Sequence, residues 1–142
     1  MAHFSKIDEN NNVVGVYVVH DNEAPNEATG ITFCQNTIGP GTYLQTSYNT
    51  EANQHTLGGT PFRGNYGGLS AKWLPDESVF QPPQEFPSWT WDSSNAKWIA
   101  PIARPTQDAN PGTFWDWDED VYNADTANPK TQGWVEIFIV DD

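Results

Sequence analysis

The apolar residues of the chain fall in short runs separated by polar loops, which is typical of β-strands and their turns. The clearest pair is a run over residues 4–7 and a β-branched run over residues 13–19, separated by the acidic and Asn-rich segment 8–12. Because Asn tolerates positive φ angles and bonds its own backbone, the pair predicts a hairpin. Residues 13–19 are apolar on both faces, so we expect this strand to be central in a sheet or covered by a partner.

The next part of the chain has a weaker pattern. Residues 21–30 are polar and predict a loop, whereas residues 31–38 fit either a short strand or a helical turn. Residues 39–69 are rich in Gly and polar side chains and predict an extended arm or a long loop. No apolar series with helical spacing is long enough to predict a helix, and the 11 Gly and 11 Pro residues would interrupt one.

Aromatic residues in the second half of the chain recur seven positions apart, in three pairs: Trp73 and Phe80, Trp91 and Trp98, and Trp115 and Tyr122. In a hairpin with a loop of two or four residues, facing positions differ by an odd number, so each pair predicts two rings that face each other across a small hairpin. The third interval is acidic and equally fits the start of a helix. A last apolar run, residues 134–140, predicts a strand that completes a sheet or pairs with another subunit.

The composition places the chain near the limit of what folds. Leu, Ile, Val and Phe together make up 27 of 142 residues, and the net charge is −13, a combination typical of disordered chains. The 7 Trp and 5 Tyr residues counter this, because each large ring can bury much apolar area. We predict a mainly β fold, a small antiparallel sheet built from hairpins with long irregular loops or an arm and little helix. Residues 1–105 would form its β-rich region, and residues 106–142 an acidic, Trp-rich hairpin and strand of the same domain.

The charge of the chain and its lack of known motifs argue against several functional classes. So acidic a chain lacks the basic stripe of a nucleic-acid binder, and no apolar run is long enough to cross a membrane. The N-terminal residues lack the apolar region of a signal peptide. A lone Cys34 beside apolar neighbours fits a buried small hydrophobe and a reducing cytoplasm. No nucleophile elbow, phosphate loop or His-Glu-x-x-His motif is present, so we expect a non-catalytic protein without a cofactor.

Two groups of residues contain possible metal ligands. His3 and His20 could lie near each other beside Asp21, but no third ligand has a diagnostic spacing, so surface histidines are the favoured interpretation. The acidic run 116–120 resembles the start of an EF-hand, but the Gly and Glu required later in that loop are absent. A looser calcium site in this run stays open, with the ligands Asp116, Asp118 and Asp120.

Several phrases of the first hundred residues are distinctive: MAHFSKIDENNNVV, GITFCQ, QTSYN, FRGNYGG, and FQPPQEFPSWTWD followed by KWIAPI. In this order they resemble a small protein family of marine bacteriophages, especially cyanophages. The resemblance covers most of residues 1–102, whereas the tail from Thr106 shares only its Trp-Asp pairs. Residues 64–68 depart from the Ala-containing phrase that other members have there. The resemblance implies a structural protein of the virion, assembled in the host cytoplasm, with no enzymatic role to carry over.

From these features we expect a capsid decoration or cement protein that binds the major capsid protein or other virion proteins, with self-association as a further option. The alternatives are a tail or tail-fibre component and a module that binds host-surface glycans through exposed Trp rings, among them Trp89, Trp91, Trp115 and Trp117. A Gly-rich arm and Pro-Trp stretches could add backbone groups to the edge of a partner's sheet. The candidate partner-binding residues are Gly64, Asn65, Tyr66, Gly67, Pro82, Pro83, Trp89, Trp115, Trp117 and Trp134.

Overall fold

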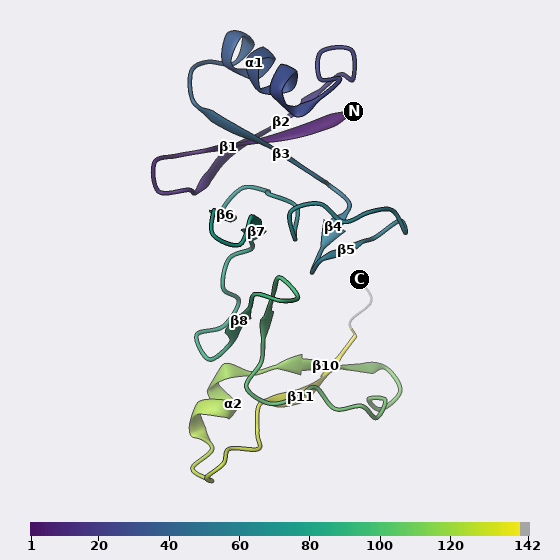
Figure 1. The fold of residues 1–142 in the computed structure, drawn as a ribbon. Coiled ribbons are helices and arrows are strands. Elements are labelled where there is room, and N and C mark those ends of the chain that lie inside the picture. Colours follow the sequence, from purple (N-terminus) through teal and green to yellow (C-terminus); the bar gives the residue numbers. More distant parts are fainter. Residues whose placement is uncertain (140–142) are drawn as a thin grey trace. The chain divides into compact units, whose positions relative to one another are not determined.

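The computed structural model describes residues 1–139 and is mainly β, with 32% strand and 12% helix, which confirms the predicted fold class. The strands form several small antiparallel sheets (Figure 1). The chain divides into two compact units. The first unit contains residues 1–83 and 91–97, and the second contains residues 84–90 and the chain from residue 98. Residue 105, the expected end of the β-rich region, lies inside the second unit.

A three-stranded antiparallel sheet forms the frame of the first unit. β1 (Ala2–Ile7) lies in the middle, between β2 (Val13–Val19) and β3 (Thr42–Thr46). The predicted hairpin of β1 and β2 is confirmed. The expectation that residues 13–19 form a central strand is wrong, because β2 lies at the edge of the sheet. A β-bulge shifts the register where Lys6 and Ile7 pair with β2, and it leaves Val14 as the extra, exposed residue.

The turn between β1 and β2 shows why this hairpin is predictable from the sequence. The Asp8 carboxylate accepts hydrogen bonds from the backbone N–H groups of Asn10 and Asn12, both at 2.9 Å. Asn11 adopts a positive φ of 66°, as the Asn-rich segment predicts. These bonds to the ionised form lower the pKa of Asp8.

A helix, α1 (Glu27–Thr37), covers one face of this sheet (Figure 1), so the predictions of a polar loop over residues 21–30 and of no helix are wrong there. Asn26 caps the helix, since its side-chain oxygen accepts the N–H of Thr29 at 2.9 Å. The helix approaches the sheet closely at Gly30, where a Cβ atom would stand 2.2 Å from Cζ of Phe4. The helix and the sheet share a core of buried residues: Ala2, Phe4, Val19, Cys34 and Tyr43.

The opposite face of the sheet is covered by the chain that leads into a second hairpin. β6 (Lys72–Leu74) pairs with β7 (Val79–Gln81), and Trp73 faces Phe80 with ring centroids 4.9 Å apart. This confirms the first predicted aromatic pair. The second core cluster consists of Ile7, Val13, Ala71 and Phe80.

Residues 39–69 do not form an extended arm. They include β3 and a small hairpin of β4 (Thr50–Glu51) and β5 (Gln54–His55). The chain then returns to the sheet at Gly67, whose carbonyl accepts the Ser5 hydroxyl. A Cβ atom at Gly67 would stand 2.7 Å from the Phe80 ring, so the close approach requires glycine.

The hairpin predicted around Trp91 and Trp98 is confirmed as β8 (Thr90–Asp92) paired with β9 (Lys97–Ile99), and the chain passes between the two units here. In the second unit, β10 (Thr113–Trp117) pairs with β11 (Trp134–Phe138). The predicted end of the last strand at Val140 lies outside the described residues.

The third predicted aromatic pair is wrong. Trp115 faces Glu136 of β11 instead of Tyr122. Tyr122 belongs to a short helix, α2 (Glu119–Ala124), which Asp118 caps by accepting the N–H of Val121 at 3.1 Å. The acidic interval is therefore the helix start that its pattern also fits.

Candidate functional site

The Gly-rich segment 64–67, predicted to bind a partner from an arm, lies against the interior of the first unit. Asn65 is only 6% exposed, and its Oδ1 accepts the Ala52 N–H at 2.8 Å. Its Nδ2 donates to the carbonyls of Phe80 at 2.9 Å and Ala96 at 2.8 Å. Both amide hydrogens thus bond within the unit, and the two flanking glycines, Gly64 and Gly67, are buried as well. Residues 64–67 are therefore not presented to a partner on an extended arm.

Three of the predicted residues do meet at a surface hollow of about 250 Å³ in the first unit. They are Asn65, Tyr66 and Pro82, and the exposed Pro83 follows directly in the chain. Tyr48 completes the aromatic part of this hollow. The remaining lining residues are Thr50, Glu51 and Thr56.

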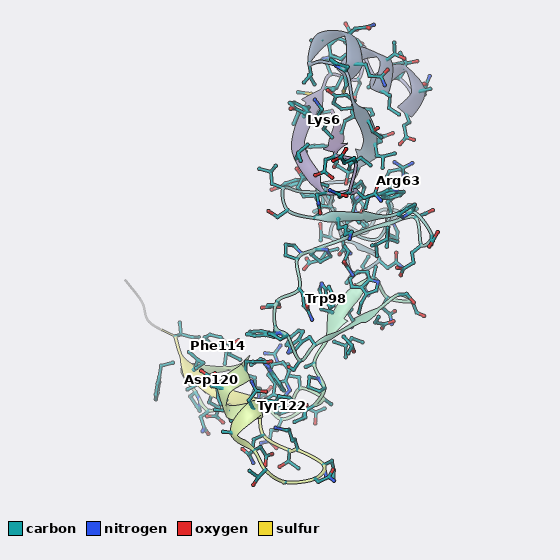
Figure 2. All side chains as sticks on the ribbon, turned by 90° about the vertical axis from the view of Figure 1, so that its left-hand side faces the viewer. Lys6, Arg63, Trp98, Phe114, Asp120 and Tyr122 are labelled. Atoms are coloured by element: carbon teal, nitrogen blue, oxygen red, sulfur yellow. The ribbon has the colours of Figure 1, made fainter. Side chains whose placement is uncertain are left out.

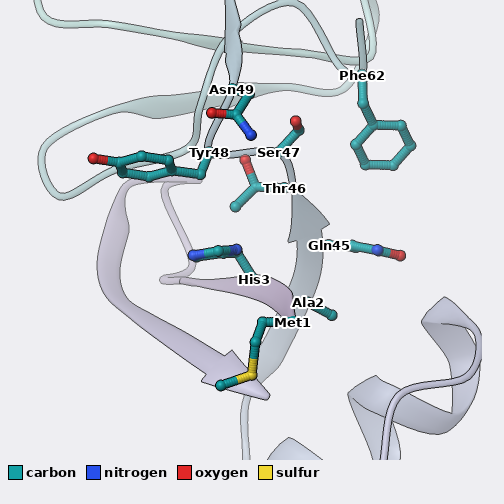
Figure 3. Close-up of a pocket in the computed structure, with 9 residues that line it drawn as sticks. All are labelled: Met1, Ala2, His3, Gln45, Thr46, Ser47, Tyr48, Asn49 and Phe62. Atoms are coloured by element: carbon teal, nitrogen blue, oxygen red, sulfur yellow. The ribbon is translucent and has the colours of Figure 1, made fainter. Parts of the chain in front are cut away.

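Tyr48 also borders a second hollow of about 270 Å³, which lies at the N-terminal end of β1 (Figure 3). In Figure 3 the rings of Tyr48 and Phe62 stand on opposite sides of the polar stretch Ser47–Asn49, with His3 below. We call this hollow the β1–β3 cleft. Its lining residues are Met1, Ala2, His3, Gln45, Thr46, Ser47, Tyr48, Asn49 and Phe62. The sequence prediction missed it, because the residues come from three separate segments.

Three rings hold one wall of the β1–β3 cleft. His3 stacks on Tyr48 with centroids 5.7 Å apart and planes 19° apart. Tyr66 meets both rings edge-on, at 5.3 Å from Tyr48 and 6.1 Å from His3. Burial and the N-terminal amine lower the pKa of His3, which favours its neutral form. Tyr48 is nevertheless 65% exposed, so a large ring is both held in place and accessible.

In the second unit, three predicted binding residues form the core instead of an exposed surface. The rings of Trp89, Trp117 and Trp134 meet with centroids between 5.3 and 6.2 Å apart. Trp117 is buried, so its use as an exposed sugar platform is wrong. The indole N–H of Trp134 donates to the Ile102 carbonyl at 2.8 Å.

The Glu119 carboxylate holds the loop that contains Trp89 through hydrogen bonds. Glu119 accepts three hydrogen bonds: from the indole N–H of Trp117 at 2.8 Å, from the hydroxyl of Ser88 at 2.7 Å and from its backbone N–H at 3.0 Å. The pKa of Glu119 is lowered, chiefly by the Trp117 and Ser88 side chains. The negative charge of Glu119 therefore stabilises the fold of the second unit.

The β10–β11 sheet turns its other face outward. Phe114 faces Ile137, and Asp116 faces Val135, on the side opposite to Trp117. Ile137 is 39% exposed and Ile139 is 60% exposed. We call Phe114, Val135, Ile137 and Ile139 the outer face of this sheet. Figure 2 labels Phe114 of this outer face. Trp115 lies on the inner side of the sheet and is half-buried, and its indole N–H donates to the Gln107 carbonyl at 3.0 Å.

The possible metal ligands do not come together in residues 1–139, where no group of three or more His, Cys, Asp or Glu side chains could hold a metal ion. Asp118 caps α2, and the Asp116 carboxylate accepts the N–H of Trp117. Asp21 pairs with the N-terminal amine of Met1 at 3.0 Å. Within residues 1–139 the structure thus brings neither the acidic run, for which the sequence leaves a calcium site open, nor the two histidines together as a metal site.

Cys34 lies on the buried face of α1, in the first core, which confirms the prediction of a buried small hydrophobe. Burial raises the pKa of its thiol, so the thiolate is disfavoured at neutral pH.

No protein-family model, no curated protein and no solved structure matches the chain. No helix within the described residues is long and apolar enough to cross a membrane. The features that bear on function are the β1–β3 cleft, the outer face and the distinctive sequence phrases.

Proposed function

We propose that the chain is a non-catalytic phage virion protein that decorates the capsid and binds the major capsid protein through the outer face of β10–β11. The sequence phrases of residues 1–102 support the virion assignment by their resemblance to a phage family. The outer face is the observation that carries the binding mode, because it presents contiguous apolar side chains at a sheet surface.

Covering the outer face would stabilise both the complex and the second unit. Fully burying one large aliphatic or Phe side chain contributes roughly 1.5–3 kcal/mol. A two-stranded sheet alone is marginally stable in water, and the packing on Trp rings covers only one face of β10–β11. A partner that binds only the folded unit shifts its folding equilibrium toward the native state.

The charge of the second unit defines the chemistry of the partner surface. Between residues 98 and 139 the basic residues are Arg104 and Lys130. Lys130 donates to the Tyr122 carbonyl at 2.9 Å, and Arg104 lies over the Trp134 ring at 5.9 Å. The remaining charges are acidic, including Asp116 on the outer face itself. The complementary surface is therefore apolar with Lys or Arg at its rim, and binding should weaken as salt rises.

Quantitative mass spectrometry of purified particles tests the virion assignment. We expect the chain to be present on the order of hundreds of copies, as repeating shell subunits require. A few copies per particle would support a tail component instead. Absence from purified particles would overturn the proposal.

A pair of neighbouring substitutions tests the binding face. Ile137→Ser should weaken binding to capsids that lack the protein by about tenfold, which corresponds to roughly 1.4 kcal/mol. Phe138→Ser is the matched control, since Phe138 is adjacent, 75% exposed and on the opposite face of the sheet. Equal losses in both variants would contradict binding through the outer face.

A further inference from the structure

The β1–β3 cleft carries a second inference, independent of capsid binding. Its nine lining residues contain no Asp, Glu, Lys or Arg, although the net charge of the chain is −13. The imidazole of His3 is held toward its neutral form by burial. The N-terminal amine is paired with Asp21. The side chains that line the cleft are thus uncharged, and Asp21 compensates the one charged group of a lining residue, the Met1 amine. This chemistry favours an uncharged ligand.

The aromatic part of the cleft supplies flat apolar surfaces. One side of the Tyr48 ring is stacked on His3, and Tyr66 contacts it edge-on, so the exposed ring is held against rotation before a ligand arrives. Phe62 presents a second ring on the other side of the cleft (Figure 3), with the Arg63 guanidinium 4.7 Å from its centroid. Rings held in this way lose little conformational entropy on binding.

The polar part of the cleft supplies hydrogen-bonding groups that residues 1–139 do not use. The side chains of Gln45, Ser47 and Asn49 line the cleft and make no hydrogen bond to another described residue. The backbone around them is fixed: the Gln45 N–H donates to Glu27, and the Asn49 carbonyl accepts the Thr56 N–H. Two amides and a hydroxyl provide both donors and acceptors on a rigid frame.

An apolar ring surface beside neutral amide and hydroxyl groups matches a pyranose, which has an apolar C–H face and a rim of hydroxyl groups that donate and accept. We propose that the β1–β3 cleft binds one neutral pyranose unit of a saccharide, with Tyr48 as the stacking ring and Asn49, Ser47 and Gln45 as hydrogen-bonding groups. The cleft volume of about 270 Å³ lies just below the range of pockets for drug-sized ligands, so it suits a ligand no larger than a single ring unit. A glycan contact therefore lies in the first unit and not on the Trp rings of the second.

Saturation-transfer NMR on the full chain tests this proposal with three probes: methyl β-glucoside, methyl β-galactoside and N-acetylglucosamine. We expect saturation of the C–H protons of at least one probe, with amide shifts at residues 45–49. Glucose 6-phosphate serves as the charged comparison and should bind more weakly than the neutral sugars. Lack of saturation for all three neutral probes, or stronger binding of the phosphate, would overturn the proposal.

Variants separate the stacking ring from general effects on the fold. Tyr48→Ala should weaken binding of the responding probe by at least about tenfold, whereas Tyr48→Phe keeps the ring and should change it by less than about threefold. Asn49→Ala should cause an intermediate loss. Phe138→Ala removes a ring that is also well exposed, in the second unit, and should leave binding unchanged. Amide spectra of each variant report whether the fold is intact, and unchanged binding in a folded Tyr48→Ala protein would contradict the site.

Discussion

The two units of the chain are stabilised in different ways. In the first unit a three-stranded sheet is covered on both faces, by α1 and by the chain around β6 and β7. In the second unit a two-stranded sheet packs one face on Trp rings and exposes the other. Among the described residues, Trp117 is the one buried hydrophobic residue of the second unit. The first unit thus buries hydrophobic residues on both faces of its sheet, whereas the second unit buries them on one face of its sheet.

Hydrogen bonds to carboxylates compensate in part for the thin core of the second unit. Besides Glu119, Asp125 accepts backbone N–H groups of Thr131 at 2.8 Å, Ala127 at 2.9 Å and Gln132 at 3.1 Å. These bonds lower the pKa of Asp125. The acidity of the chain is thus partly structural, since these anions organise the loop after α2.

The largest expected effect tests whether the first unit depends on its own core. Phe4→Ala removes a fully buried ring that lies against Gly30 and should lower the free energy of unfolding by about 3–5 kcal/mol. Urea unfolding followed by amide NMR measures it. The indole N–H signal of Trp117 should keep its position, because that ring belongs to the other unit. Loss of native signals in both units together would contradict separate cores.

The next effect concerns the buried amide of the first unit. Asn65→Ala leaves the carbonyls of Phe80 and Ala96 without their donor and should cost roughly 2–3 kcal/mol, since each buried group left unpaired is destabilising. Thermal unfolding measures the loss. Asn95→Ala is the matched control, because Asn95 is exposed and bonds only to its neighbour Asp92. A control loss as large as that of Asn65→Ala would remove the special role of the buried amide.

The stability of the second unit should depend on pH through the carboxylate of Glu119. The folded-state pKa of Glu119 is lowered, so its stabilising contribution is complete above the unfolded pKa of about 4.3 and is lost as pH falls through the folded value. Glu119→Gln should therefore destabilise the second unit at pH 7 and reduce the loss of stability in acid. Amide exchange of β10–β11 at several pH values measures both effects. The exposed Glu85 of the same unit is the control, because Glu85→Gln removes the same charge and should leave amide exchange of β10–β11 at pH 7 unchanged.

The smallest expected effect lies at the edge of the first sheet. Val14 is the extra residue of the β-bulge and is exposed, so Val14→Thr should change the unfolding free energy by less than about 0.5 kcal/mol. Chemical denaturation measures it. A loss above about 1 kcal/mol would show that the Val14 side chain is buried, contrary to its exposed position at the bulge.

The sequence predicts the parts of the fold that depend on local signals. The Asn-rich turn at residues 8–12, the aromatic pair of Trp73 and Phe80, and the β8–β9 hairpin follow from turn residues and spacing alone. α1 was not predictable from periodicity, because its buried residues are Gly30 and Cys34 and it has no apolar stripe. The cap at Asn26 and the acidic Glu27 in the first turn were the available signals.

Long-range packing accounts for the predictions that failed. The composition around Asn65 predicts an extended arm or a long loop. Asn65 instead forms hydrogen bonds with Ala52, Phe80 and Ala96, which no local pattern identifies. Trp115 pairs with Glu136 because the strand partner of β10 lies beyond α2. The β1–β3 cleft joins residues from the N-terminus, β3 and Phe62, so its lining could not be read from one motif.

Native-state hydrogen exchange of the isolated chain tests the central contrast most directly. We predict slow exchange for hydrogen-bonded amides of β1, the central strand of a sheet covered on both faces, and exchange at least about tenfold faster for β10 and β11. Binding of capsids should then slow β10 and β11 and leave β1 unchanged. Equal protection of β1 and β10–β11 in the isolated chain would contradict the claim that the second unit is the less stable one until a partner covers its outer face.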